Sequence, residues 1–184
     1  MKIFDRLDAS VNFASEERQL IDSVRVLARD KIAPRATAYD KSGDFPWDNV
    51  KAINALGLNA MFVPEAYGGA QMSYAAYLEC VREISKACAS TGIIWATNFH
   101  AMKPLVDWGN EEQKQRLLPL IAQGALGALA ITEPSGGSDV ANLRTTARRE
   151  GDHYVVNGSK MFITSGMRAD YYTVAVRTGG PGAG

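Results

Sequence analysis

The chain has 184 residues, of which 46% are hydrophobic and 22% charged, the ordinary balance of a soluble globular protein with a buried core. Lys plus Arg and Asp plus Glu number 20 each, so the formal net charge is zero. A neutral chain lacks the positive field that holds nucleic acid or an anionic membrane, and any phosphate site must therefore be local.

The sequence gives no sign of a membrane segment or a signal peptide. The N-terminus lacks an uninterrupted apolar stretch, and the most apolar window, residues 91–102, is too short to span a bilayer. Cys80 and Cys88 fall two turns apart in one predicted helix, roughly 12 Å of rise and too far for a disulfide. We therefore expect two buried free thiols and a cytoplasmic location.

The first two-thirds of the chain has the apolar spacing of helices. Residues 16–32 carry a helical stripe, with Ser15 as the expected N-cap and Pro34 as the residue that ends or loosens the helix. A shorter helix is expected over residues 46–56, closed by Gly57.

Three further helices complete this predicted bundle. Residues 74–88 carry an apolar stripe, and residues 93–106 are so apolar that burial on most sides is expected. Asn110 is the expected cap of a last helix, which ends at Gly124.

After Gly124, alternating β-branched and aromatic residues replace the helical period. The predicted strands are residues 126–132, 143–149, 153–156, 160–164 and 171–177. The fold class is therefore α+β: an N-terminal all-α helical bundle, residues 1–125, followed by an incomplete antiparallel β-barrel domain, residues 126–184. So few strands make too little sheet for a closed β domain, so we expect a truncated chain.

The turn at residues 131–140 is a candidate anion site. Gly136 and Gly137 leave backbone N–H groups open to a close-lying oxyanion, and Ser138 adds a hydroxyl donor. A plain polar β-turn is the alternative.

A second candidate lies at residues 158–166. On a strand, Phe162 and Thr164 share one face, which pairs an aromatic wall with a hydroxyl and suits a flat heterocycle with polar edges. A sheet face packed on the core is the alternative.

The sequences TEPSGGSD at 132–139 and NGSKMFITSG at 157–166 together resemble the flavin site of acyl-CoA dehydrogenases. Residues 63–69 and 110–114 also resemble that family, so the likeness covers essentially the whole chain. It implies FAD as cofactor and the following flavin-binding residues: Leu129, Ile131, Thr132, Gly137, Ser138, Phe162, Ile163 and Thr164.

The resemblance also implies a role for each part of this set. The backbone of Ile131 and Thr132 would meet the ring, Gly137 and Ser138 would lie by phosphates, and Ser138 would also reach the CoA moiety. Phe162, Ile163 and Thr164 would cover the isoalloxazine, although many members of the family have Trp at the position of Phe162.

Candidate residues for the acyl pocket are spaced for one helical face, and the alternative is plain core packing; they are Trp95, Asn98, Phe99 and Met102. His100 and His153 are not expected to act as acids or bases. No cluster has the spacing of metal ligands, so no metal is expected.

The reaction that the resemblance implies is α,β-dehydrogenation of fatty acyl-CoA thioesters, with electrons passed to a transfer acceptor by a homotetrameric parent protein. The family's base is a glutamate of a C-terminal helical domain that this sequence does not contain. We therefore assign no catalytic residue and expect the isolated chain to be inactive. The alternatives are an acyl-CoA oxidase or flavin monooxygenase on the same scaffold, and a non-catalytic CoA- or flavin-binding module.

Overall fold

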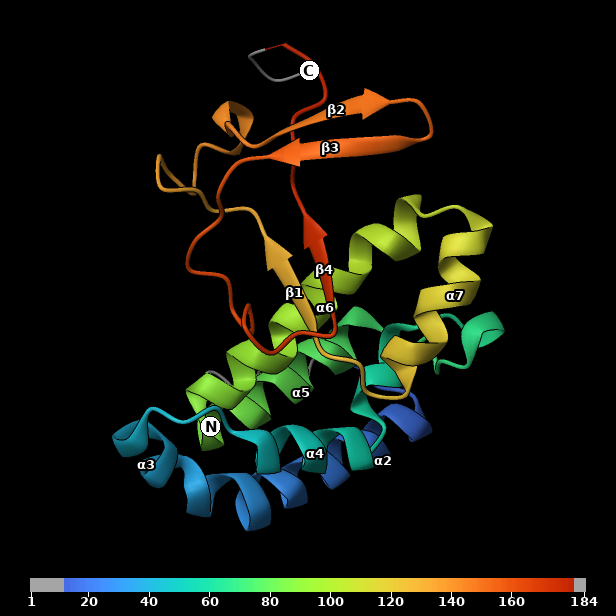
Figure 1. Cartoon of the computed structure of the whole chain (residues 1–184). Helices are drawn as coiled ribbons and strands as arrows, with labels where there is room; N and C mark the ends of the chain where they lie inside the picture. The colour runs from blue at the N-terminus through green and yellow to red at the C-terminus, as the bar shows by residue number, and fades with distance from the viewer. Residues whose placement is uncertain (1–11, 181–184) are drawn as a thin grey trace.

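The computed structural model describes residues 12–180, which form a layer of helices with two small sheets on one side of it (Figure 1). The helices are α2 (Ser15–Leu27), α3 (Ala33–Ser42), α4 (Trp47–Ala55), α5 (Tyr74–Ala87), α6 (Ala89–Trp108) and α7 (Glu111–Ala122). The strands are β1 (Gly127–Ala130), β2 (Thr146–Glu150), β3 (His153–Asn157) and β4 (Tyr171–Val174). No helix among the described residues is long and apolar enough to cross a membrane.

The first predicted helix differs from the structure at its start and near its end. Ala14, not Ser15, is the N-cap, because the Glu17 carboxylate reaches back and accepts the Ala14 N–H at 3.1 Å. Of the two effects predicted for Pro34, it does not end the helix, but the helix widens just before it: the chain passes through a π-helical turn, Ala28–Ile32, directly into α3. Pro34 lies in the first turn of α3, where a missing N–H costs little.

The remaining helix boundaries follow local signals. Ser73 caps α5 by accepting the Ala76 N–H at 3.2 Å. Asn110 caps α7 as predicted, with its side chain accepting from Gln113 N at 2.8 Å while the Gln113 side chain accepts from Asn110 N at 2.9 Å. Both ends of the reciprocal cap therefore have their backbone donors satisfied.

The core of the helical layer is made by α2, α4, α5 and α6 around a set of fully buried side chains that includes Ile32, Ile53, Leu58, Met61 and Ile84. Cys80 and Cys88 are both buried and free, as the sequence predicted. Burial raises the pKa of the Cys80 thiol to about 12, so this thiol is protonated and unreactive at neutral pH.

The two sheets each have two strands. β2 and β3 form an antiparallel hairpin, with Thr146 opposite Asn157. β1 and β4 pair in parallel, with Gly127 opposite Tyr171. The predicted class, a helical region followed by an open β region, is confirmed; the parallel pair is a departure from the antiparallel pairing expected throughout.

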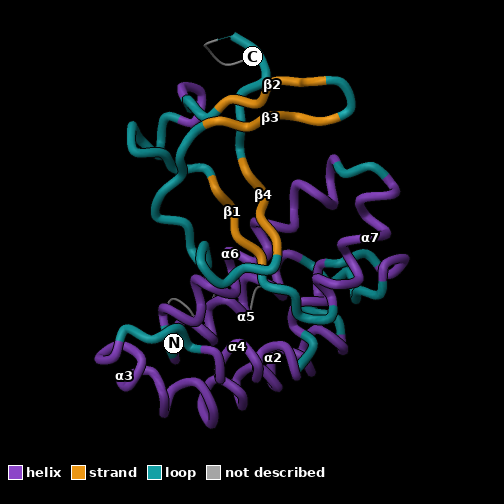
Figure 2. The backbone as a smooth tube through the Cα atoms, in the orientation of Figure 1, coloured by secondary structure: helices purple, strands orange, loops and turns teal. Residues whose placement is uncertain are grey.

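The prediction of a strand over residues 160–164 is wrong. Figure 2 shows this segment as a loop that leaves the end of β3 and runs past β1 to the start of β4. Phe162 has φ +56° and Ser165 has φ +63°, values outside the β region. The reason is tertiary: residues 160 and 161 bond to the chain leaving β1 rather than to a neighbouring strand.

Candidate functional site

The two segments singled out in the sequence lie against each other. The Met161 N–H donates to the Thr132 carbonyl at 2.9 Å, and the Lys160 ammonium donates to the Ile131 carbonyl at 3.0 Å. Residues 131–138 and 158–166 therefore form one surface, although the hairpin of β2 and β3 separates them in sequence.

Glu133 holds this surface together from the inside. Its side chain is only 4% exposed and accepts hydrogen bonds from the backbone N–H of Arg144 at 2.6 Å and of Thr145 at 2.8 Å. It also pairs with Lys160 at 2.9 Å. Hydrogen bonds from Thr145, Arg144 and Lys160 hold the pKa of Glu133 far below its usual range. A carboxylate that already accepts these hydrogen bonds stabilises the local structure and is a poor base.

The glycine-rich turn is tighter than an open anion nest. Glu133 and Gly136 exchange two backbone hydrogen bonds of 3.0 Å, with Gly136 at φ +153°, so the Gly136 N–H is used inside the turn. At Gly137, a Cβ would lie 3.1 Å from Thr132 Oγ1, so glycine there allows the chain to lie close to Thr132. Ser138 follows on the exposed side. An anion contact at Gly137 and at the Ser138 hydroxyl stays a prediction.

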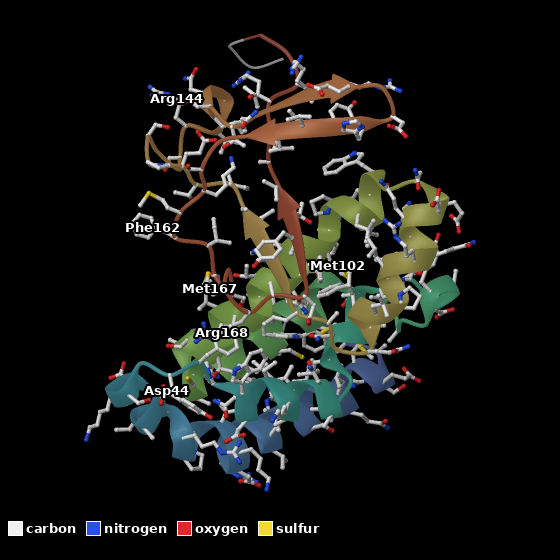
Figure 3. All side chains as sticks on the ribbon, in the orientation of Figure 1. Asp44, Met102, Arg144, Phe162, Met167 and Arg168 are labelled. Carbon is white, nitrogen blue, oxygen red and sulfur yellow. The ribbon has the colours of Figure 1, made fainter. Side chains whose placement is uncertain are left out.

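Phe162 is the most unusual side chain of the surface. Its ring is 84% exposed, and its positive φ is rare for a bulky residue. Figure 3 shows Phe162 and Met167, which is 90% exposed, on the same flank of the molecule. Ile163 and Thr164, beside Phe162, are half-buried. An aromatic ring held out by strained backbone fits a surface that a flat ligand covers.

The four candidates for an acyl pocket lie on α6 and in part belong to the core. Trp95, Asn98 and Met102 are buried, whereas Phe99 is half-buried and its ring centroid lies 4.2 Å from that of Phe62. The free space beside them is a cavity of about 10 Å³, no more than one water molecule needs. Their contact with an acyl chain stays a prediction, and in this structure it requires side chains to move.

One flavin candidate and the two histidines remain. Leu129 is half-buried on β1, in line with Ile131 and Thr132. His100 is exposed on α6, and His153 is exposed beside Asp152 at 3.1 Å. Within residues 12–180 no group of three or more His, Cys, Asp or Glu side chains is arranged to hold a metal ion.

Among the residues expected to hold a flavin, Thr132 is half-buried, Ser138 and the Phe162 ring are exposed, and Gly137 has no side chain. They offer an apolar ring for a flat heterocycle and backbone and hydroxyl donors for its polar edge and phosphates, so they fit the group.

Comparison with known proteins decides the family. The family model described as the acyl-CoA dehydrogenase N-terminal domain matches residues 14–125, and the one for the middle domain matches residues 128–184. The chain belongs to the acyl-CoA dehydrogenase family. An acyl-CoA dehydrogenase of Bacillus subtilis is 40% identical over 164 residues, which are 88% of this chain and 43% of that protein.

Solved structures of acyl-CoA dehydrogenases agree. Butyryl-CoA dehydrogenase from Megasphaera elsdenii superposes with a TM-score of 0.83 at 29% identity, covering 90% of this chain and 45% of that one. A glutaryl-CoA dehydrogenase from Mycobacterium smegmatis in complex with FADH2 superposes with a TM-score of 0.82 at 31% identity, covering 90% and 43%. The chain thus spans less than half the length of these relatives.

Two residues that organise this acyl-CoA dehydrogenase surface were given no role from the sequence. The role of Lys160 could have been found from the sequence, because a lysine next to Met, Phe and Ile needs a buried partner of opposite charge, and Glu133 is a candidate for that partner. Arg177 donates to the carbonyls of Leu143 at 3.0 Å and of Ala141, which fixes the loop after Ser138. Partners that are backbone carbonyls leave no trace in the sequence, so this contact was not predictable.

Proposed function

We propose that this chain supplies the flavin-facing and thioester-facing surface of an FAD-dependent acyl-CoA dehydrogenase that forms α,β-unsaturated fatty acyl-CoA. The observation that carries the proposal is the joining of residues 131–138 to residues 158–166 through Met161 and Thr132. Family membership supports it, as does the relative whose title names FADH2.

The residues proposed to hold FAD are those that the resemblance assigned. Backbone groups of Ile131 and Thr132 meet the ring, Phe162 with Ile163 and Thr164 covers it, and Leu129 lies along it. Gly137 and Ser138 donate to phosphates, with Ser138 also toward CoA. When bound, FAD supplies the acceptor for the hydride that leaves the β-carbon of the substrate.

The chain's own contribution is binding, orientation and exclusion of water. The exposed ring of Phe162 stacks on a flat surface and keeps water from it. We assign the hydroxyls of Thr132 and Thr164 to the polar rim of the ring. The proposed acyl-pocket residues, Trp95, Asn98, Phe99 and Met102, would have to open the packed region on α6 to admit an acyl chain.

No base is proposed from this chain. Glu133 already accepts from Arg144, Thr145 and Lys160, and removing a proton from the α-carbon needs a carboxylate that is free to take it. Glu79 and Glu83 are engaged by arginines, with Glu79 3.0 Å from Arg25. We therefore expect residues 1–184 alone to form no measurable enoyl-CoA.

The electron acceptor separates the remaining alternatives. An electron-transfer acceptor is proposed for a dehydrogenase, whereas an oxidase or monooxygenase on this scaffold consumes oxygen. The protein that carries this chain, assayed with butyryl-CoA in an oxygen electrode and with a dye acceptor, distinguishes them. The homotetramer and the cytoplasmic location stay predictions; gel filtration and cell fractionation of the protein that carries this chain test them.

The direct test of the flavin surface is titration of the chain with FAD, followed by the change in flavin fluorescence and absorption. We expect binding by the wild type and about tenfold weaker binding by Phe162→Ser, because stacking on the ring is lost. Tyr154→Ser, which removes an exposed aromatic ring from β3, is the matched control and should bind as the wild type does. No binding by the wild type, or equal binding by Phe162→Ser, contradicts the proposal.

A further inference from the structure

Lys160 is an unusual lysine, because its side chain is only 10% exposed. Its ammonium donates to Glu133 Oε1 at 2.9 Å and to the Ile131 carbonyl at 3.0 Å. Burying two charges costs desolvation that their attraction often only offsets, so such a pair is weak evidence of a gain in stability. The contribution of this pair is instead the fixed position that it gives to the Lys160 ammonium.

The geometry is fixed from two sides. Backbone N–H groups of Arg144 and Thr145 hold the Glu133 carboxylate, and that carboxylate in turn holds the Lys160 ammonium. The ammonium is therefore kept at the carbonyl of Ile131 and has little freedom to leave it. The next residue, Met161, donates its N–H to the Thr132 carbonyl at 2.9 Å. Two successive peptide planes of the segment leaving β1 are thus oriented by two successive residues of the loop.

A positive charge at Ile131 acts beyond that carbonyl. In a planar trans peptide unit the carbonyl and the following N–H point in opposite directions. The Thr132 N–H therefore leaves this unit on the side away from Lys160. A charged donor on the carbonyl polarises the whole unit, which strengthens its N–H as a hydrogen-bond donor.

We propose that Lys160 is a positioning residue that, held by Glu133, orients and polarises the Ile131–Thr132 peptide so that the Thr132 N–H donates to the flavin ring. This inference rests on the proposed function, in which that backbone meets the ring. A strengthened donor favours the reduced ring, which carries more electron density, over the oxidised one. Lys160 thus acts on the redox balance of the cofactor without touching it.

The test compares Lys160→Gln with wild type and two controls, in the chain loaded with FAD. Lys160→Gln should bind reduced flavin about tenfold more weakly relative to oxidised flavin, which lowers the midpoint potential by about 30 mV. Lys160→Arg keeps a cation and should recover most of the shift. Lys103→Gln breaks a more exposed lysine–carboxylate pair, with Asp107 on α6, and should leave the potential unchanged.

A second measurement needs no flavin. Amide hydrogen exchange at Met161 should become about tenfold faster in Lys160→Gln than in wild type, and should not change in Lys103→Gln. If Lys160→Gln does not fold, Lys160→Met, which keeps the apolar stem and drops the charge, replaces it in both measurements.

The outcomes separate the inference from the proposed function. An unchanged potential in a loaded Lys160→Gln chain overturns the inference and leaves the proposed function standing. A wild-type chain that binds no flavin rejects the proposed function and, with it, the effect on potential. In that case faster exchange at Met161 in Lys160→Gln still supports the positioning of the peptide, and equal exchange overturns it.

Discussion

The side-chain oxygen of Asn98 accepts a hydrogen bond from the backbone N–H of Gly127 at 2.6 Å. The same oxygen lies 3.3 Å from the hydroxyl of Tyr171, which donates to it. Gly127 and Tyr171 are register partners at the start of β1 and β4. One buried amide on α6 therefore seats the parallel strand pair, and with it the segment that leaves β1 for the candidate flavin surface.

Replacement of Asn98 should weaken the contact between α6 and the start of β1 and β4. In Asn98→Ala, the buried Gly127 N–H loses its acceptor and the Tyr171 hydroxyl keeps only the backbone carbonyl of residue 98, which should cost about 1–3 kcal/mol in the free energy of unfolding. Denaturant unfolding of the flavin-free chain measures this. Asn142→Ala is the control, because Asn142 is exposed and bonds only to nearby Asp139, so its change should stay within about 0.5 kcal/mol. Equal losses of unfolding free energy in the two variants would show that the Asn98 side chain does not stabilise the start of the β1–β4 pair.

Gly127 should tolerate no side chain. A Cβ there would lie 2.4 Å from Cζ and the hydroxyl oxygen of Tyr171 and 2.9 Å from Ala101 Cβ. Gly127→Ala should therefore lower the free energy of unfolding by about 1–3 kcal/mol through overpacking. Gly179→Ala, at a position with nothing within 4 Å of an added Cβ, is the control and should leave stability unchanged. A melting curve of Gly127→Ala that coincides with the wild type would contradict this packing.

Arg177 should hold the loop that follows Ser138. Its guanidinium donates to the carbonyls of Leu143 at 3.0 Å, Gly180 at 2.8 Å and Ala141, a fork that lysine cannot reproduce. Arg177→Lys should speed amide exchange at Asn142 and Leu143 about tenfold, because their local structure opens more often. Arg148→Lys, at an exposed arginine of β2, should leave those amides as in the wild type. Unchanged exchange in Arg177→Lys would mean that the loop is held by other contacts.

Because of Glu133, the free energy of unfolding should decrease as the pH falls into the acid range. Its folded-state pKa is depressed by hydrogen bonds from Thr145, Arg144 and Lys160, so the ionised form favours folding. That contribution is fully present above the unfolded-state pKa of about 4 and is lost as the pH falls below it toward the lower folded-state pKa. Thermal unfolding of Glu133→Gln should therefore show a shallower decline than wild type below about pH 4.

The control for this pH series is Glu112→Gln, the same substitution on the exposed first turn of α7, which should decline as steeply as the wild type. Identical slopes for Glu133→Gln and wild type would show that the Glu133 carboxylate does not favour the folded chain in its ionised form.

Several features could be predicted from the sequence because their causes are local. The reciprocal cap of Asn110 and Gln113 is encoded within one turn of helix. The burial of nine residues of α6 between Thr91 and Met102 follows from the apolar composition of this part, and the free state of Cys80 and Cys88 from their spacing along the chain. The two segments of the candidate flavin surface could be found because their residue types and spacing resemble a known family.

Other features were predicted wrongly because a distant contact outweighs a local preference. The apolar run at residues 160–164 has strand composition, but the Lys160 ammonium and the Met161 N–H find partners at Ile131 and Thr132, and the segment becomes a loop. Ser15 is a better N-cap residue than Ala14, yet the Glu17 side chain, which also accepts the Ser73 N–H at 2.9 Å, reaches back to Ala14.

The sequence by itself determined most of the helices, the cap at Asn110, the class of fold and which short segments carry the family's flavin motif, because each depends on residues close in the chain. The tertiary structure alone decided that Glu133 and Lys160 join those segments, that Phe162 faces outward and that Asn98 seats the parallel strands. The physical reason is that a buried charge or amide accepts whatever partner the packed fold brings within hydrogen-bond distance, and such a partner can lie anywhere in the sequence.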